Sequence, residues 1–171
     1  MPLADACDDR HVAHLATIGV YGFDLPSFLS ALEAAGVGTV LDVRQRRGVR
    51  GSQYAWANSR RLQASLAEAG LEYRHHPELA PTTELRELQY AEDARGGVGK
   101  RSRVELAPAY VERYMREILD GADLEPIAAR LASDRPAALM CVERDPEACH
   151  RSLIASRFAS EHGADVVHLR P

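Results

Sequence analysis

The chain has 171 residues, of which 46% are hydrophobic and 27% charged, a composition typical of one globular domain that can bury about two-thirds of its unfolded surface. Its three cysteines form no even-numbered disulfide framework, no apolar run approaches the roughly 20 residues of a membrane span, and the N-terminus lacks the apolar core of a signal peptide, so we expect a cytoplasmic protein with no membrane partner. The net charge of −4 is unevenly distributed, because six arginines and no acid lie between Arg44 and Arg61, and such a basic patch usually faces an anion.

The first half of the chain alternates between predicted strands and helices. Apolar or β-branched runs predict strands at 14–22, 39–44 and 71–79, and helical spacing of apolar residues predicts helices at 24–38 and 58–70. Strands that alternate with helices in this way form a parallel sheet with helices on both faces.

The second half continues the pattern after a less regular stretch. It contains predicted helices at 81–93, 107–121 and 123–134, a strand at 136–142, a helix at 145–163 and a last strand at 164–169. The Gly-rich, basic segment 94–103 is expected to be an exposed loop. No repeat or linker divides the chain. We therefore predict a single α/β domain over residues 1–171, a three-layer sandwich with a mainly parallel sheet, in which residues 1–13 form a flexible tail.

Polar side chains follow several predicted strands at their carboxyl ends. Asp42 and Glu78 lie at the ends of the second and third predicted strands, and Glu143 follows the fourth. In an open parallel sheet these ends meet at one edge, where ligands bind. Each carboxylate can activate water or stabilise a developing cation, so the three are candidate catalytic residues. Asp42 can instead form a structural ion pair with Arg44, and Glu78 can simply cap a turn.

The arginine-rich segment RQRRGVRGSQYAWANSRR, residues 44–61, lies at the same predicted edge. Arginine pairs with phosphate through parallel hydrogen bonds, and aromatic rings stack on bases. The segment thus offers candidate phosphate- and base-binding residues: Arg44, Arg46, Arg47, Arg50, Tyr54, Trp56 and Arg60. A second basic loop, with Lys100, Arg101 and Arg103, can close over the same ligand. The alternative is a solvated arginine loop that its aromatic residues anchor to the core.

The segment CVERDPEACHR, residues 141–151, joins the fourth predicted strand to a helix. Asp145 suits the N-cap and Pro146 the first helical position, so we expect the helix to begin near residue 146. That start places Cys149 and His150 just past the first turn, where adjacent side chains diverge, and puts His150 on the buried face.

Several interpretations of this segment remain open. Cys141, Cys149 and His150 are plausible zinc ligands, although no CxxC pair is present. Cys149 near a helix N-terminus can be a reactive thiol. Both cysteines can equally be small core residues. His150 and Arg151 can form an anion pocket with the helix N-terminus, or be a capped histidine and a surface arginine.

These motifs resemble the DUF488 family of bacterial and archaeal proteins. The resemblance runs through TIGVYGFDLPSFLSALEAAGVGTVLDVR, the arginine loop, LEYRHHPEL and CVERDPEACHRSLIA, in that order, over roughly residues 14–169. It implies an α/β fold and a shared site that includes Gly19, Asp42, Arg44, Glu78, Leu79, Cys141, Glu143, Cys149, His150 and Arg151. Two positions depart from the family pattern. Val20 and Tyr21 follow Gly19 where the family often has His-Ser, and Ala80 stands where it often has Gly.

The leading functional hypothesis is a hydrolase that acts on a nucleic acid, DNA more than RNA, or on a nucleotide. The arginines and Arg151 would hold phosphate, while Asp42, Glu78 or Glu143 would work with His150 to activate water. No cofactor motif is visible, so we expect no cofactor and no metal. A narrower version is cleavage of the glycosidic bond of a damaged base, as in DNA repair. The alternatives are a non-catalytic nucleic-acid-binding or sensor module, and a thiol or metal protein centred on Cys141 and Cys149.

Overall fold

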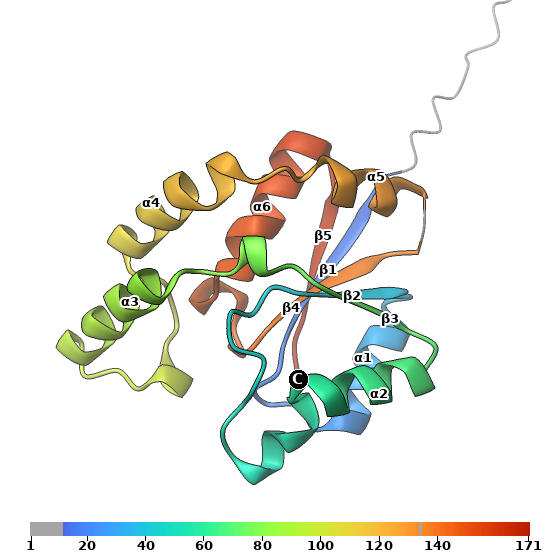
Figure 1. Cartoon of the computed structure of the whole chain (residues 1–171), viewed down its shortest axis with the longest axis horizontal. Coiled ribbons are helices and arrows are strands. Elements are labelled where there is room, and N and C mark those ends of the chain that lie inside the picture. Colours follow the sequence, from blue (N-terminus) through green and yellow to red (C-terminus); the bar gives the residue numbers. More distant parts are fainter. Residues whose placement is uncertain (1–11, 134) are drawn as a thin grey trace, which may run out of the picture.

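The computed structural model describes residues 12–133 and 135–171, which form one five-stranded sheet between two layers of helices (Figure 1). The strands are β1 (His14–Gly19), β2 (Thr39–Asp42), β3 (Glu72–His75), β4 (Ala137–Cys141) and β5 (Asp165–Leu169). All are parallel, in the order β3-β2-β4-β1-β5. The predicted α/β fold with its parallel sheet is confirmed.

Helices cover both faces of the sheet. They are α1 (Leu25–Ala34), α2 (Ser59–Glu68), α3 (Thr83–Arg95), α4 (Pro108–Glu117), α5 (Glu125–Ser133) and α6 (His150–His162). α1 and α2 pack on one face, α4, α5 and α6 pack on the other, and α3 lies against α4 (Figure 1). None of the helices in the described ranges combines the length and hydropathy that a membrane span requires.

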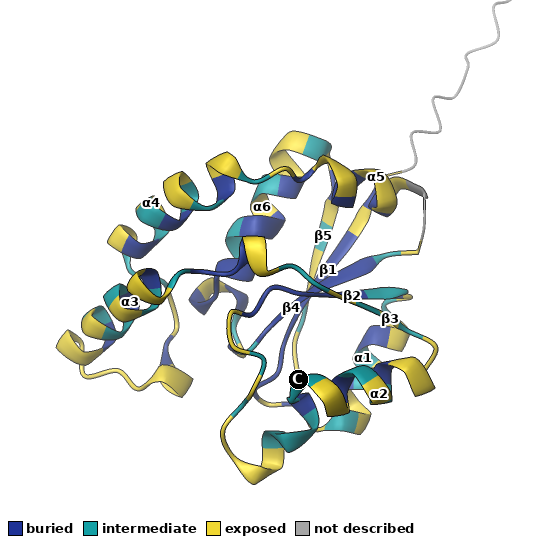
Figure 2. Cartoon of the chain, viewed as in Figure 1, coloured by how far each residue is buried: buried dark blue, intermediate teal, exposed yellow. Residues whose placement is uncertain are grey.

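The central strand β4 has an entirely apolar sequence because both of its faces are buried. Every residue of β4 is buried, and Figure 2 shows the centre of the sheet in the buried colour. Its side chains alternate between the two layers, so that Leu139 and Cys141 join the cluster under α4, α5 and α6. Ala138 and Met140 join the cluster under α1 and α2. A strand with no solvated face has no polar position to fill.

The start of α6 differs from the prediction. We expected a helix from about residue 146, but Pro146–Ala148 form a 3-10 turn, and Cys149 is the extended N-cap of α6, with φ −141° and ψ 141°. The amide of Cys149 donates to the carbonyl of Pro146 at 3.0 Å, which closes the turn before α6 begins. Asp and Pro suit the start of either a 3-10 turn or an α-helix, so their sequence signal did not distinguish the two.

Two further predictions concern the ends of elements. The predicted flexible tail, residues 1–13, lies outside the described residues except for Val12 and Ala13. The helix predicted at 107–121 divides into α4 and a 3-10 turn over Leu119–Gly121.

Candidate functional site

A pocket of about 460 Å³ opens at the carboxyl edge of the sheet, beyond β2 and β4. Most of its wall comes from three parts of the chain that are distant in sequence: the loop after β2, α3 with the 3-10 turn Lys100–Ser102, and the segment from Cys141 to His150. Some of the polar side chains that the sequence placed at this edge line the pocket and others do not. The position of each side chain decides which of them can act together.

The pocket carries a strong positive charge. Five basic side chains in its wall form no ion pair with a carboxylate in the described ranges, and Glu143 is the one acidic side chain that lines it there. We call these five the basic rim: Arg46, Arg50, Arg86, Lys100 and Arg101. Two of them belong to the predicted arginine loop and two to the second basic loop, so both loops contribute to one pocket. Such a wall attracts an anion.

Glu143 lies two residues beyond β4 and is 8% exposed. Burial, followed by the nearby charge of Cys149, raises the pKa of its carboxyl group to about 7, although Arg103 and Lys100 oppose this shift. Arg103 Nη1 lies 3.6 Å from Glu143 Oε1, and Arg103 itself is held by Asp93, whose oxygens accept from Arg103 Nε at 3.0 Å. The structure therefore places a buried carboxyl group against a fixed guanidinium in the pocket.

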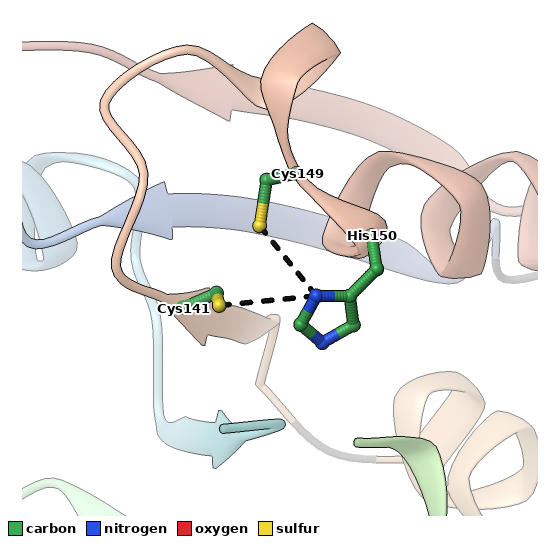
Figure 3. Close-up of side chains that lie close together, drawn as sticks. All are labelled: Cys141, Cys149 and His150. Carbon is green, nitrogen blue, oxygen red and sulfur yellow. Dashed lines mark hydrogen bonds between the residues drawn. The ribbon is translucent and has the colours of Figure 1, made fainter. Parts of the chain in front are cut away.

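Cys141, Cys149 and His150 line the pocket, and Figure 3 shows that their side chains lie close together. Their sulfur and nitrogen atoms lie within 4.8 Å of one another, with His150 Nδ1 at 3.9 Å from Cys141 Sγ and 3.8 Å from Cys149 Sγ. The expectation that Cys149 and His150 diverge is wrong, because Cys149 is an extended N-cap rather than a helical residue. Both cysteines are buried, as a core role would require, yet both also line the pocket.

The two thiols differ in acidity. Burial raises the pKa of Cys149, but a hydrogen bond from Cys141 and the nearby Arg151 and His150 side chains outweigh burial and hold that pKa well below its ordinary value. The hydrogen bond to Cys149 and burial raise the pKa of Cys141. Of the pair, Cys149 is therefore the more acidic thiol.

Asp42 and Arg44 are bound to each other, and of the two only Arg44 lines the pocket. Arg44 donates Nε and Nη2 to the two oxygens of Asp42 at 2.9 and 2.8 Å, and its Nη1 donates to the Ala57 carbonyl at 2.9 Å. Tyr73 adds a hydroxyl donor to Asp42 at 2.6 Å. Both members of the pair are almost completely buried, so the structural ion pair is the alternative that the geometry favours.

Arg151 lies in the interior, with no exposed surface. Its Nη1 donates to the carbonyl of Glu143 at 2.7 Å and its Nη2 to the carbonyl of Arg144 at 3.0 Å. Gly19 fits beneath the same loop, because a Cβ atom there would lie 1.8 Å from the Glu143 carbonyl oxygen. Arg151 is thus a positioning residue for the loop of Glu143, not the surface arginine considered above.

The predicted stacking residues pack elsewhere. The ring centroid of Tyr54 lies 5.0 Å from that of Tyr21, and Trp56 lies 4.9 Å from Phe28. Neither lines the pocket, whereas Tyr21 does. Tyr54 and Trp56 therefore pack against other aromatic rings of the protein, as expected if they anchor the arginine loop to the core.

Three other candidates lie outside the pocket wall: Arg47, Arg60 and Glu78. Arg60 is exposed on α2, and Glu78 accepts a hydrogen bond from His76 Nδ1 at 2.6 Å. They do not converge with Glu143.

Several pocket residues have no counterpart among the candidates. Arg86 and Tyr90 lie four residues apart on α3, and Arg86 Nη2 donates to the Tyr90 hydroxyl at 2.9 Å. The spacing could have shown that the two share a helix face, but not that α3 packs on α4 beside the pocket. Gln89 and Tyr110 belong to the wall for the same reason.

Comparison with known proteins gives one match. A family model described as "Domain of unknown function DUF488" matches residues 24–158, which include the arginine loop and the segment from Cys141 to Arg151. Neither the curated proteins nor the solved structures that were compared contain a match.

Proposed function

This chain belongs to the DUF488 family, and we propose that it is a hydrolase that acts on a nucleotide or a nucleic acid bound in the pocket beyond β2 and β4. The observation that carries the proposal is the buried carboxyl group of Glu143 facing a pocket whose other charged groups are basic. The family description assigns no reaction, so the support comes from the site.

Phosphate is the ligand chemistry that suits the basic rim. Four of its five members, three arginines and one lysine, lie on loops and turns, and Arg86 adds a cation from α3. Guanidinium groups bind phosphate oxygens in pairs, and several cations together compensate for the two or more charges of a nucleotide. The volume of about 460 Å³ falls within the range of small-molecule pockets.

Tyr90 is the aromatic residue best placed to contact a base. It lies in the pocket wall, and the charged ends of Arg86 and Lys100 lie 5.7 and 5.6 Å from its ring centroid. A base that stacks on this ring would bring its phosphate close to both cations. Tyr90 takes the role that the sequence suggested for Tyr54 or Trp56.

Glu143 supplies the acid–base chemistry in this proposal. Hydrolysis adds the oxygen of water to the electrophilic atom and a proton to the leaving group, so one carboxyl group can remove the first proton and deliver the second. His150, the partner suggested by the sequence, already uses Nε2 in a 3.0 Å hydrogen bond with the Val43 carbonyl. For a damaged nucleotide the bond cleaved would be the glycosidic bond, and for a nucleotide phosphate it would be a phosphorus–oxygen bond.

The test is a hydrolysis assay over nucleoside phosphates, single- and double-stranded DNA with base lesions, and RNA. We expect at least one substrate to be cleaved by the wild-type protein. Glu143→Gln should lower turnover by about 100-fold or more, the usual contribution of a general acid or base, while binding persists. The matched control is Glu147→Gln, because Glu147 is exposed and pairs with Arg170 outside the pocket. Binding without any turnover in the wild type would instead favour a non-catalytic binding module.

A further inference from the structure

We propose that Cys141, Cys149 and His150 bind a zinc ion in the wall of the pocket. All three are buried, and all three line the pocket. Two thiolates and one imidazole form a ligand set that zinc favours over harder cations such as magnesium.

The distances suit a tetrahedral ion. Zinc bonds of about 2.3 Å to sulfur and 2.0–2.1 Å to nitrogen separate a sulfur and a nitrogen ligand by about 3.6 Å. The two separations from His150 Nδ1 are 3.9 Å to Cys141 Sγ and 3.8 Å to Cys149 Sγ. In Figure 3 both sulfur atoms point toward this nitrogen from different parts of the chain, the end of β4 and the start of α6. All three ligand atoms lie within 4.8 Å of one another, so small movements of these side chains would bring them onto one ion.

His150 is held in the form that binds a metal. Its Nε2 lies 3.0 Å from the Val43 carbonyl oxygen, which accepts a hydrogen bond and therefore requires the proton on Nε2. The lone pair of Nδ1 then faces the two sulfur atoms. Metal-bound histidines commonly donate their second ring N–H to a carbonyl or carboxylate in this way, which fixes both tautomer and orientation.

The charge of the filled site also suits its surroundings. A zinc ion with two thiolates and a neutral imidazole has no net charge, so it can lie in the interior at small electrostatic cost. The neighbours include the ring of Tyr114, whose centroid is 5.4 Å from that of His150. Without an ion, the partners of Nδ1 among the described residues are two thiols, which are weak S–H donors.

The fourth coordination position would open into the pocket. Three protein ligands and one free position are the pattern of catalytic zinc, whereas structural sites have four protein ligands. Glu143 lies two residues from Cys141 in the same pocket wall. A bound water at this position would provide the nucleophile for the hydrolysis, and this one consequence rests on the proposed function; the metal site itself does not.

The experiment measures metal directly. The wild-type protein, purified under reducing conditions and loaded with Zn²⁺, should retain about one zinc per chain after dialysis, measured by mass spectrometry. Replacement by Co²⁺ should give the visible absorption of a tetrahedral ion and a near-ultraviolet band from sulfur ligation. Cys149→Ser and His150→Ala should each lower zinc affinity by more than the 10–100-fold typical of losing an outer-shell partner. Cys7→Ser, which changes the third cysteine of the sequence, should retain full affinity.

The possible outcomes test the zinc site and the proposed hydrolase function separately. Less than a tenth of an equivalent of zinc in reduced wild-type protein, or a cobalt spectrum unchanged by Cys149→Ser, would overturn the metal site. A disulfide between the two cysteines that persists in the presence of reductant would do the same. Bound zinc in a protein that cleaves no nucleotide or nucleic acid would leave the site standing and remove the hydrolase.

Discussion

Arg151 donates Nη1 to the carbonyl oxygen of Glu143 at 2.7 Å, so a guanidinium with no exposed surface holds the loop that carries the carboxyl group of the pocket. The same side chain donates to the carbonyl of Arg144. Hydrogen bonds from a charged donor contribute about 1.5–3 kcal/mol each, and removing the donor leaves buried carbonyls without a partner. A side chain of α6 therefore helps to fix the position of the loop that carries Glu143.

Arg151→Lys should lower the free energy of unfolding by about 2–3 kcal/mol, because one ammonium group cannot replace the planar fork that reaches two carbonyls. Urea unfolding followed by circular dichroism measures this change. Arg144→Lys is the control, since Arg144 is exposed and should change stability by less than about 0.5 kcal/mol. Equal stability of the two variants would show that the carbonyls find other donors.

Gly19→Ala should destabilise the protein by about 1–3 kcal/mol, because the added Cβ would lie 1.8 Å from the Glu143 carbonyl oxygen and must push that loop away. Thermal unfolding gives the change. Gly121→Ala is a matched control, since its Cβ would meet no atom within 4 Å. If Gly19→Ala is as stable as Gly121→Ala, the loop of Glu143 can move away from β1 without a loss of stability.

Stability at low pH should depend on Asp93. Burial raises the pKa of Asp93, but the hydrogen bonds from Arg103 and Gln89 outweigh burial and hold that pKa below its usual 3.8. The folded-state pKa is thus lower than the unfolded one, so the stabilisation is present above pH 3.8 and is lost as the pH falls through the folded-state pKa.

Asp93→Asn should therefore cost stability at pH 7 and cost much less at a pH well below 3.8, where Asp93 is protonated in the wild type as well. Urea unfolding at the two pH values measures the difference. Asp120→Asn removes an exposed partner of Arg157 and should show only a small loss at either pH. A loss from Asp93→Asn that is the same at both pH values would contradict the assignment.

The basic rim should dominate binding of anionic ligands. Arg50→Ala and Arg101→Ala should each weaken binding of a short oligonucleotide and reduce the slope of log affinity against log salt by about 0.7–0.9 for each phosphate that the variant no longer neutralises. Fluorescence anisotropy across a salt series provides both values. Arg60→Ala removes an exposed arginine of the same loop region that lies outside the pocket. An equal loss of affinity from Arg60→Ala would move the binding surface away from the pocket.

The sequence was sufficient for the fold class, because strands that alternate with helices form a parallel sheet, but it did not predict the order of the strands. It also identified Glu143 and the two basic loops, since residues that follow parallel strands meet at one edge. It could not show that Asp42 and Arg44 pair with each other, because two residues on the same side of an extended chain can face a ligand or each other. The hydrogen bonds that join their side chains decide for the ion pair.

Other pocket residues depended on packing between distant segments. Arg86 and Tyr90 reach the pocket because α3 rests on α4, an arrangement that no local pattern encodes. The side chains of Cys149 and His150 lie close together because Cys149 is the extended N-cap of α6. Asp145 and Pro146 suit the start of a 3-10 turn as well as that of an α-helix, so the sequence could not predict this conformation.

The order of the strands also has a consequence for synthesis of the chain. β4 lies between β1 and β2, so two strands made early share no hydrogen bonds with each other and wait for one made much later. The sheet cannot close on the ribosome until residues 137–141 have emerged, and Glu143, Cys149 and His150 follow directly behind them. The central strand and the pocket residues behind it are made after β1, β2 and β3, so the two halves of the sheet can be joined only late in synthesis.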